Sequence, residues 1–350
     1  MDIIKALAKE LDKQEEHVSN VVTLLDEGNT VPFIARYRKE MHGTMDDQTI
    51  RTLADRLQYL RNLEERKKEV LSSIEAQGKL TEELRARIES AETLAAVEDE
   101  YRPFKQKRRT RATIAREKGL EPLALLLFAQ EKDCPAPEEA AKEYIDEEKG
   151  VSSVEEALAG AGDIIAENIS DDAAVRGALR DYAMKCGDVC SEAAKKDPED
   201  TVYRNYYKFT CAVKSIPSHR VLALNRGEKE GVLKVWVEVP HDNALELIFR
   251  RVVKKPACAS TAFVKAAAED AFDRLIEPSL EREVRAALTE TASEGAIGQF
   301  ALNLRPLLMQ PPVKGFVTMG LDPGYRMGCK VAVVDGTGKV LDTAVVYPTH

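Results

Sequence analysis

Apolar positions at helical spacing predict two short helices at the start of the chain. Asp2 can cap a first helix, and Asp12 with Glu15 three positions on has the pattern of a capping box for a second helix, which Gly28 ends. Two such helices in tandem have the outline of a helix-turn-helix. The second helix offers few long basic side chains for a DNA groove, however, so the pattern favours structural packing.

A longer apolar stripe follows and predicts one dominant helix. Thr44 with Asp47 has the pattern of a helix start, and Gly78 that of its end. Apolar residues between these two positions recur with a period near 3.6 residues. The stripe consists of Ile50, Leu53, Leu57, Leu60, Leu63, Val70, Leu71 and Ile74. At 1.5 Å per residue, we expect a helix about 45 Å long, which organises the helices around it.

The middle of the chain is predicted to be helical with one β element. Residues 151–194 keep a helical and acidic pattern, and residues 243–308 are helical and rich in Ala. Between these segments, residues 232–239 (VLKVWVEV) alternate apolar and charged side chains, which predicts one strand or half a hairpin.

Beyond Pro311 and Pro312 the pattern changes from helices to strands. Short apolar runs at 316–321, 329–334 and 340–346 predict a meander, with Asp-Gly-Thr-Gly as a tight turn between the last two. Three strands without a covering helix are only marginally stable. We therefore expect the sequence to be the first part of a longer protein, cut inside a domain.

These patterns predict a mainly α protein, a multi-helical scaffold with a short β element near 232–239. We expect three regions: an N-terminal helical region over 1–130, a central helical region over 131–312 that is first acidic and then Ala-rich, and the beginning of a further domain over 313–350.

The composition argues against several classes of protein. No run of 18 apolar residues exists, and the first residues do not form a signal peptide, so we expect neither a membrane span nor secretion. The six cysteines contain no Cys-x-x-Cys pair and the five histidines lie far apart, so neither a disulfide framework nor a zinc site is indicated. We expect a cytoplasmic protein with no metal or other cofactor and no evident small-molecule substrate.

The net charge of −9 conceals an uneven distribution. Residues 121–200 hold 8 basic and 21 acidic side chains, whereas residues 102–118 hold eight basic side chains and a single acid, Glu117. Five of those eight lie within seven positions, after two aromatic residues and a proline. They are Lys105, Lys107, Arg108, Arg109 and Arg111. We call residues 105–111 the basic loop.

The basic loop is the strongest candidate site. Cations and aromatic rings on one loop suit contacts with a phosphate backbone, together with base stacking. The alternative is a solvated loop, or one salt-bridged to the acidic segment 131–148. The pattern alone leaves both open, because basic runs are common and specify no particular partner.

Two smaller clusters are more simply read as structural. Arg36, Arg38 and Lys39 follow an apolar segment, and we expect the two arginines to pin helices through carboxylates such as Asp26. The cluster at 203–209 has four aromatic and two basic residues and could stack bases, but a packed aromatic contact between helices is the commoner outcome.

Asp322, at the end of the first terminal strand, is the one carboxylate placed like a metal ligand. A two-metal nuclease needs several such carboxylates around its ions, and Asp335 and Asp342 fit turn and strand-surface positions better. Asp322 is therefore a weak catalytic candidate, and we expect no enzyme activity within this chain.

Four stretches of the sequence resemble the Tex family of bacterial transcription accessory proteins. They are residues 27–40 (EGNTVPFIARYRKE), 59–66 (YLRNLEER), 107–117 (KRRTRATIARE) and 321–330 (LDPGYRMGCK). The resemblance implies an N-terminal region with a helix-turn-helix-like unit and, at the end of the chain, the first strands of a YqgF-type α/β domain of ribonuclease-H-like fold. It also implies helix-hairpin-helix motifs and an OB-fold RNA-binding domain, and we expect the OB-fold domain to be absent from these 350 residues.

Three functional hypotheses follow. The leading one is an RNA- or DNA-binding factor that acts on transcription, in which the basic loop holds phosphates without sequence preference and RNA polymerase or ribosome-associated proteins are partners. The second is a metal-dependent nuclease centred on Asp322 in the full-length protein. The third is a protein-interaction scaffold that presents the acidic middle of the chain.

Overall fold

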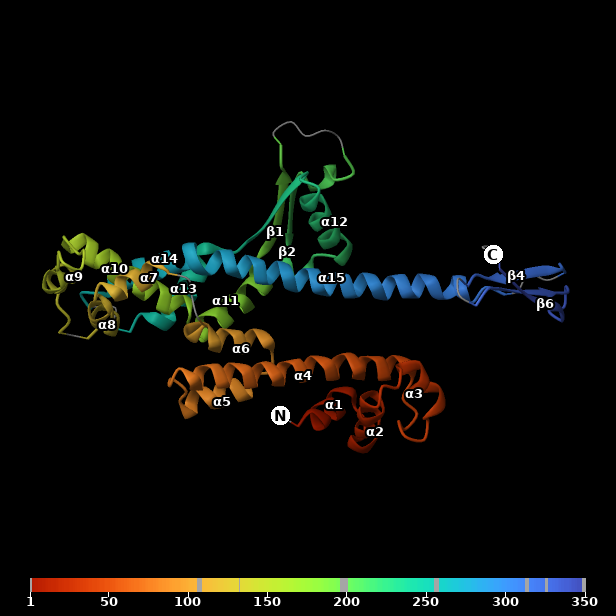
Figure 1. Cartoon of the computed structure of the whole chain (residues 1–350). Helices are drawn as coiled ribbons and strands as arrows, with labels where there is room; N and C mark the ends of the chain where they lie inside the picture. Colours follow the sequence, from red (N-terminus) through yellow and green to blue (C-terminus); the bar gives the residue numbers. More distant parts are fainter. Residues whose placement is uncertain are drawn as a thin grey trace. The chain divides into compact units, whose positions relative to one another are not determined.

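The computed structural model describes residues 2–105, 109–131, 133–195, 201–254, 258–311, 315–324 and 327–347 (Figure 1). The chain divides into two compact units. The first comprises Met1–Ile216 with Ala223–Leu288, and the second comprises Pro217–Leu222 with Thr289–His350.

The first unit begins with a helical subdomain around one long helix, as the apolar stripe predicts. Its elements are α1 (Ile3–Leu11), α2 (Glu15–Asp26), α3 (Val31–Tyr37), α4 (Asp47–Ala76), α5 (Glu82–Ser90) and α6 (Leu94–Tyr101). Seven of the eight stripe residues of α4 are buried, and they form one hydrophobic cluster with buried residues of α1, α2, α3, α5 and α6. We call it the N-terminal cluster.

Two predicted helix starts are wrong, although the helices themselves are confirmed. Asp12 does not cap α2; it ends α1 in a left-handed conformation, with φ 52° and ψ 52°. Thr44 does not cap α4, because it also lies in the left-handed region, with φ 66°. Asp46 takes that role, and its Oδ1 accepts a hydrogen bond from the Thr49 amide at 2.8 Å. Both errors have one cause. Asp12 and Thr44 adopt left-handed backbone conformations in the turns before the next helices, so neither can act as an N-terminal cap.

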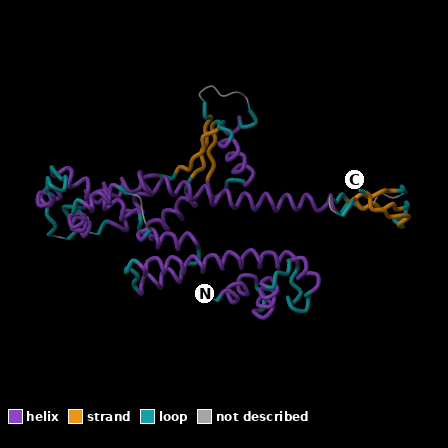
Figure 2. The backbone as a smooth tube through the Cα atoms, in the orientation of Figure 1, coloured by secondary structure: helices purple, strands orange, loops and turns teal. Residues whose placement is uncertain are grey.

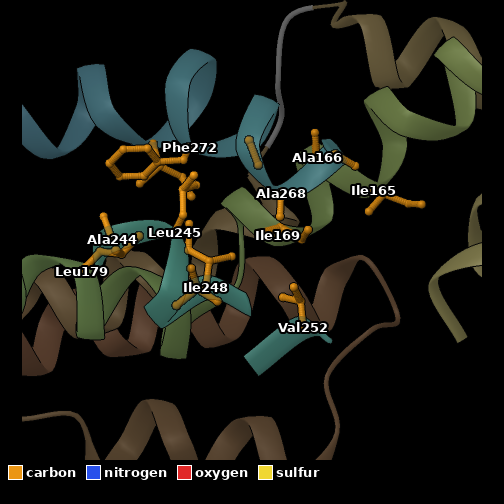
Figure 3. Packing of buried hydrophobic residues seen from close by; sticks show 14 of the residues in the cluster. Ile165, Ala166, Ile169, Leu179, Ala244, Leu245, Ile248, Val252, Ala268 and Phe272 are labelled. Atoms are coloured by element: carbon orange, nitrogen blue, oxygen red, sulfur yellow. The ribbon is translucent and has the colours of Figure 1, made fainter. Parts of the chain in front are cut away.

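A second hydrophobic cluster, the central cluster, holds the rest of the first unit together. Figure 3 shows part of it, with Phe272 packed among side chains of α10, α11, α13 and α14. The short helix η1 (Arg102–Phe104) precedes it. The helices of the central cluster are α7 (Arg111–Glu117), α8 (Glu121–Ala129), α9 (Pro137–Ala141), η2 (Lys142–Tyr144), α10 (Val154–Ser170), α11 (Ala173–Cys186), α13 (His241–Val252), α14 (Thr261–Asp270), the π-helical turn η5 (Ala271–Ile276) and the first part of α15 (Glu277–Leu308).

The basic loop lies at the boundary between the two hydrophobic clusters: buried residues before it belong to the N-terminal cluster, and those after it belong to the central cluster. Phe104 packs against the N-terminal cluster, whereas Ala112 and Ala115 of α7 are buried in the central cluster. The loop therefore connects two separately packed groups of helices within the first unit.

A three-stranded antiparallel sheet completes the first unit (Figure 2). It consists of β1 (Asp188–Ala193), β2 (Lys208–Ala212) and β3 (Leu233–Glu238) in the order β2-β1-β3, and the chain between the strands forms η3 (Arg204–Tyr206), η4 (Val213–Ser215) and α12 (Ser218–Lys229). The strand predicted at 232–239 is confirmed. The helical prediction up to residue 194 is wrong, because α11 ends at Cys186 and the next residues pair with β2 and β3.

The aromatic cluster at 203–209 packs, as expected, but at η3 and the strand β2 instead of between helices. Tyr203 is buried, and the rings of Tyr206 and Phe209 meet edge to face with 5.4 Å between their centroids.

The second unit contains the predicted terminal meander. Its strands β4 (Thr318–Asp322), β5 (Cys329–Val334) and β6 (Val340–Val346) form an antiparallel sheet in that order. The Asp335 carboxylate accepts hydrogen bonds from the amides of Thr337 and Lys339, which fixes the tight turn between β5 and β6.

Candidate nucleic-acid interface

The basic loop is held at both ends by short helices. η1 ends at Phe104, and α7 begins at Arg111 after Thr110 as its N-terminal cap. The Thr110 hydroxyl accepts a hydrogen bond from the Thr113 amide at 3.0 Å and donates one to Glu167 of α10, also at 3.0 Å. The C-terminal end of the loop is thereby fixed to the central cluster.

Three of the five predicted contact residues are described, and all three side chains are exposed. The Lys105 side chain is 60% exposed, and its ammonium lies 3.9 Å from Glu98. The Arg109 side chain is 69% exposed and pairs with Glu117 at 2.8 Å. Arg111 is exposed at the first position of α7. Such exposed pairs are weak and exchange readily for another anion, since a surface ion pair contributes about 0–1 kcal/mol.

The two remaining predicted contacts, Lys107 and Arg108, lie outside the described residues.

Other cations of the segment 102–118 are used inside the fold. Arg102 pairs with Asp171 at 3.3 Å, and Lys118 donates to the Gly150 carbonyl at 2.7 Å. Arg116 pairs with Glu167 at 2.6 Å and donates to the side-chain oxygen of Asn168 at 3.1 Å. The basic run therefore separates into anchoring residues and solvent-facing residues, a division that the sequence does not indicate.

A groove of about 870 Å³ adjoins the loop, and Lys105 lines it. Its cationic side chains come from separate helices and connections. They are Lys79, Arg87, Lys105 and Arg116. No local sequence pattern relates Lys79 and Arg87 to the loop, so only the folded structure shows that they line the groove.

Carboxylates also line the groove, and several of them are engaged by neighbouring cations. Glu100 accepts from Arg87 at 3.1 Å, and Asp171 and Glu167 are held by Arg102 and Arg116. Phe104 is the aromatic ring on this surface. The groove thus offers a mixed polar wall beside an exposed cationic loop.

Arg111 also influences one carboxylate of the central cluster. Burial is the largest effect on Asp163 and raises the pKa of its carboxyl, while the charges of Arg274 and Arg111 oppose that increase. Arg111 therefore lies within electrostatic reach of α10 even though its side chain is exposed.

In the second basic group, Arg36 and Lys39 are exposed, and the two arginines lie near aromatic rings instead of the expected carboxylates. Arg38 lies over the Phe33 ring, with 5.3 Å between guanidinium carbon and ring centroid, and Arg36 lies 6.0 Å from the centroid of Tyr37. Asp26 is bound instead by Arg61 through two hydrogen bonds of 2.7 and 2.8 Å. The expected pairing with Asp26 is wrong, because α4 brings Arg61 to that carboxylate.

Asp322 lies at the end of β4, directly opposite Lys330 of β5 in the strand register. Residues in such a position share a face of the sheet, so the nearest register neighbour of this carboxylate is a cation. Among the described residues, no group of three histidines, cysteines or carboxylates is arranged to hold a metal ion. Nor does any helix in the described part of the chain have the length and apolar character needed to cross a membrane.

The sequence matches three family models in order along the chain. Residues 1–75 match the Tex-like protein N-terminal domain, residues 133–300 match the Tex central region-like domain, and residues 316–350 match the Tex protein YqgF-like domain.

Several known proteins are similar over nearly the whole chain. A Bacillus subtilis protein, YdcI, is 47% identical over 98% of this chain and 48% of its own length. The transcriptional accessory protein Tex of Neisseria gonorrhoeae is 42% identical over 99% of this chain and 46% of its own length. The human S1 RNA-binding domain-containing protein 1 is 31% identical over 99% of this chain and 36% of its own length.

The chain thus spans about half the length of its bacterial relatives, or less in the human case. The three Tex models follow one another along the chain, and the last of them, a YqgF-like domain, covers the strands β4 to β6. The chain belongs to the Tex family.

Proposed function

We propose that this chain is the helical scaffold of a transcription accessory factor and that it binds nucleic acid through the phosphate backbone. The observation that carries the proposal is the division of the basic segment. Arg102 and Arg116 fix its flanks by internal ion pairs, whereas Lys105, Arg109 and Arg111 remain exposed between two packed clusters. Exposed cations on a segment whose described flanks are fixed can meet a polyanion at a small cost in ordering entropy.

The alternative partner of the loop, the acidic segment 131–148, fits less well. The carboxylates beside Lys105 and Arg109 are Glu98 and Glu117, which belong to α6 and α7. Both pairs are exposed, so phosphate can replace the carboxylate at little energetic cost. Lys107 and Arg108 are included in the proposal from the sequence alone.

Binding of this kind is electrostatic and indifferent to sequence, so salt dependence tests it. Each neutralised phosphate contributes about 0.9 to the slope of log K against log salt on duplex DNA and about 0.7 on single strands. Replacing all five loop cations by Ala is expected to reduce the slope by roughly 3 to 4 on single-stranded RNA. The measurement is fluorescence anisotropy of a labelled oligonucleotide over a salt series.

A matched variant separates the loop from general surface charge. It removes five exposed cations that lie elsewhere on the first unit: Lys5, Arg51, Lys68, Lys185 and Arg250. Its net charge equals that of the loop variant, but its slope should stay close to that of the parent chain. Equal losses in both variants would remove the loop from the binding site.

We further propose that the chain binds without catalysis. A cation opposite Asp322 in the register disfavours the approach of a divalent metal, and two-metal cleavage needs several converging carboxylates. A relative is named as a transcriptional accessory protein, which agrees with a role in binding. A cytoplasmic location, with RNA polymerase or ribosome-associated proteins as partners, completes the proposal.

The acidic middle of the chain is a less favoured docking surface for proteins. Several of its carboxylates already serve the fold, since Glu167 pairs with Arg116, Asp163 with Arg274 and Asp171 with Arg102. A pull-down that survives nuclease treatment and is lost when exposed acids of this region are reversed would instead support a protein scaffold.

A further inference from the structure

Two cysteines from distant segments have neighbouring thiols in the first unit. Cys134 lies between α8 and α9, and Cys258 lies between α13 and α14. The Cys134 amide donates to the Glu131 carbonyl at 3.1 Å, the same carbonyl that the Cys258 thiol approaches, and the Cys134 sulfur lies 3.9 Å from the Leu126 carbonyl oxygen. The Cys258 thiol and the Ser260 hydroxyl are among the groups that influence the pKa of the Cys134 thiol. The Cys258 sulfur itself lies 3.4 Å from the Ser260 hydroxyl oxygen and 3.2 Å from the Glu131 carbonyl oxygen. The spacing in the sequence gives no sign of this pair.

The two connections that carry these cysteines are clamped together by buried hydrogen bonds. Gln130 is fully buried, and its side-chain amide donates to the Val252 carbonyl at 2.8 Å while its oxygen accepts from the Lys254 amide at 3.3 Å. Ser260 is also fully buried and donates to the Leu127 carbonyl at 2.8 Å. These hydrogen bonds bring the segment before Cys134 and the residues around Cys258 close together.

We propose that Cys134 and Cys258 are a reversible disulfide pair, a thiol-modification site that reacts with low-molecular-weight disulfides such as oxidised glutathione. Neither sulfur takes part in a disulfide in this structure. The proposal is independent of nucleic-acid binding, because it concerns a different part of the first unit.

Unequal exposure of the two thiols sets the order of the reaction. Cys258 is partly exposed, whereas Cys134 is 8% exposed. Burial raises the pKa of the Cys134 thiol, so this residue is a poor first nucleophile. Cys258 therefore meets the oxidant first.

Oxidation by thiol–disulfide exchange takes two steps, each of which conserves atoms and electrons. The Cys258 thiolate attacks one sulfur of oxidised glutathione, and the other glutathione leaves as a thiolate that takes up the proton. The Cys134 thiolate then attacks the Cys258 sulfur and displaces the second glutathione, which is protonated in turn. Two protein thiols are oxidised to one disulfide, and one oxidised glutathione is reduced to two glutathione molecules.

The bond would tie the α8–α9 connection to the α13–α14 connection. Cross-links that close long loops stabilise a fold mainly by restricting the unfolded chain. We expect the midpoint of thermal unfolding to rise by a few degrees in the oxidised chain and to return to its starting value when dithiothreitol is added.

The test is to equilibrate the chain in buffers with different ratios of oxidised to reduced glutathione, block the remaining thiols with N-ethylmaleimide and map the peptides by mass spectrometry. The expected product is a peptide that joins Cys134 to Cys258 and disappears after reduction. Cys134→Ser should stop the second step and leave glutathione attached to Cys258, whereas Cys258→Ser should leave Cys134 unmodified.

Two controls keep the result interpretable. Cys186 is exposed and lies outside the pair, so Cys186→Ser should form the Cys134–Cys258 bond as readily as the parent chain. A far-ultraviolet circular dichroism spectrum checks that each serine variant is folded. The proposal is overturned if folded parent chain yields glutathione adducts without the linked peptide, or if Cys258 pairs with a different cysteine.

Discussion

The guanidinium of Arg176 and the carboxylate of Asp99 form a buried ion pair that joins α11 to α6. The Nε of Arg176 donates to Asp99 Oδ1 at 3.2 Å, and the arginine is only 2% exposed. Arg180 donates to the same carboxylate at 2.8 Å, and Glu283 of α15 contacts both arginines. Three helices of the first unit are thereby held by one network of charges.

Removing the carboxylate should destabilise the first unit strongly. Asp99→Ala removes one of the two carboxylates that pair with the buried Arg176, the other being Glu283, and breaking a buried pair in this way costs about 3–5 kcal/mol of unfolding free energy. Chemical denaturation followed by circular dichroism measures the change. Glu98→Ala is the matched control, because Glu98 neighbours Asp99 on α6 but pairs with Arg66 at the surface; it should cost less than about 1 kcal/mol. Equal costs would show that the network does not stabilise the fold.

The helical part of the fold was predictable because its information is local. The stripe in α4 repeats at the helical period from Ile50 to Ile74, about seven turns, so its buried face can be assigned without any knowledge of partners. β1 was missed for the opposite reason. Its sequence, DVCSEA, does not alternate cleanly, and the strand exists because β2 and β3 pair with it from distant positions.

The candidate site was predictable only in part, because part of it depends on partners distant in the sequence. The run of cations marks the segment, but its anchoring residues are defined by partners far along the chain. Arg102 depends on Asp171 and Arg116 on Glu167, and these carboxylates reach the loop only after α10 has folded. Lys79 and Arg87 belong to the adjoining groove by tertiary proximity alone.

A tight turn between α3 and α4 makes a second prediction possible. Gly43 has φ +58°, and a Cβ at this position would lie 2.1 Å from the His17 imidazole Nδ1. Gly28 has φ +84°, and a Cβ built on it would have no atom within 4 Å. Both Gly→Ala substitutions carry the left-handed backbone penalty of about 1–2 kcal/mol, but only Gly43→Ala adds a steric overlap worth roughly 1–3 kcal/mol.

Urea denaturation of the two variants measures this difference. Adding His17→Ala should recover most of the extra loss in Gly43→Ala and have no such effect in Gly28→Ala. If both variants lose the same stability, the contact with His17 is not a constraint on the turn.

His241 should give the first unit a pH-dependent contribution to stability. Its Nε2 lies 2.9 Å from Asp273 Oδ1, and this hydrogen bond, more than any other interaction, raises the pKa of the imidazole above its ordinary value. A folded-state pKa above the unfolded value of about 6.5 means that the contribution is fully present below pH 6.5. It is lost as the pH rises through the folded-state pKa.

The comparison is between the parent chain and Asp273→Asn, with urea midpoints taken from pH 5.5 to 8.5. The parent should lose stability relative to the variant as the pH increases, and the His241 Cε1 proton should titrate at higher pH in the parent spectrum by nuclear magnetic resonance. Parallel stability curves would argue against the pair. The side chain is 43% exposed, so high salt should reduce the effect.

The facing positions of Asp322 and Lys330 lead to a prediction about chemistry. A divalent metal at Asp322 would have to approach a carboxylate whose register neighbour is positively charged, and one carboxylate cannot hold two metals. We expect the chain, and any longer form that contains it, to leave single strands, duplexes and junctions intact in the presence of magnesium or manganese. Asp322→Asn should change nucleic-acid affinity less than twofold, since the proposed phosphate contacts lie in the basic loop. Metal-dependent cleavage that disappears in Asp322→Asn would make this position catalytic and would require further carboxylates from outside the described residues.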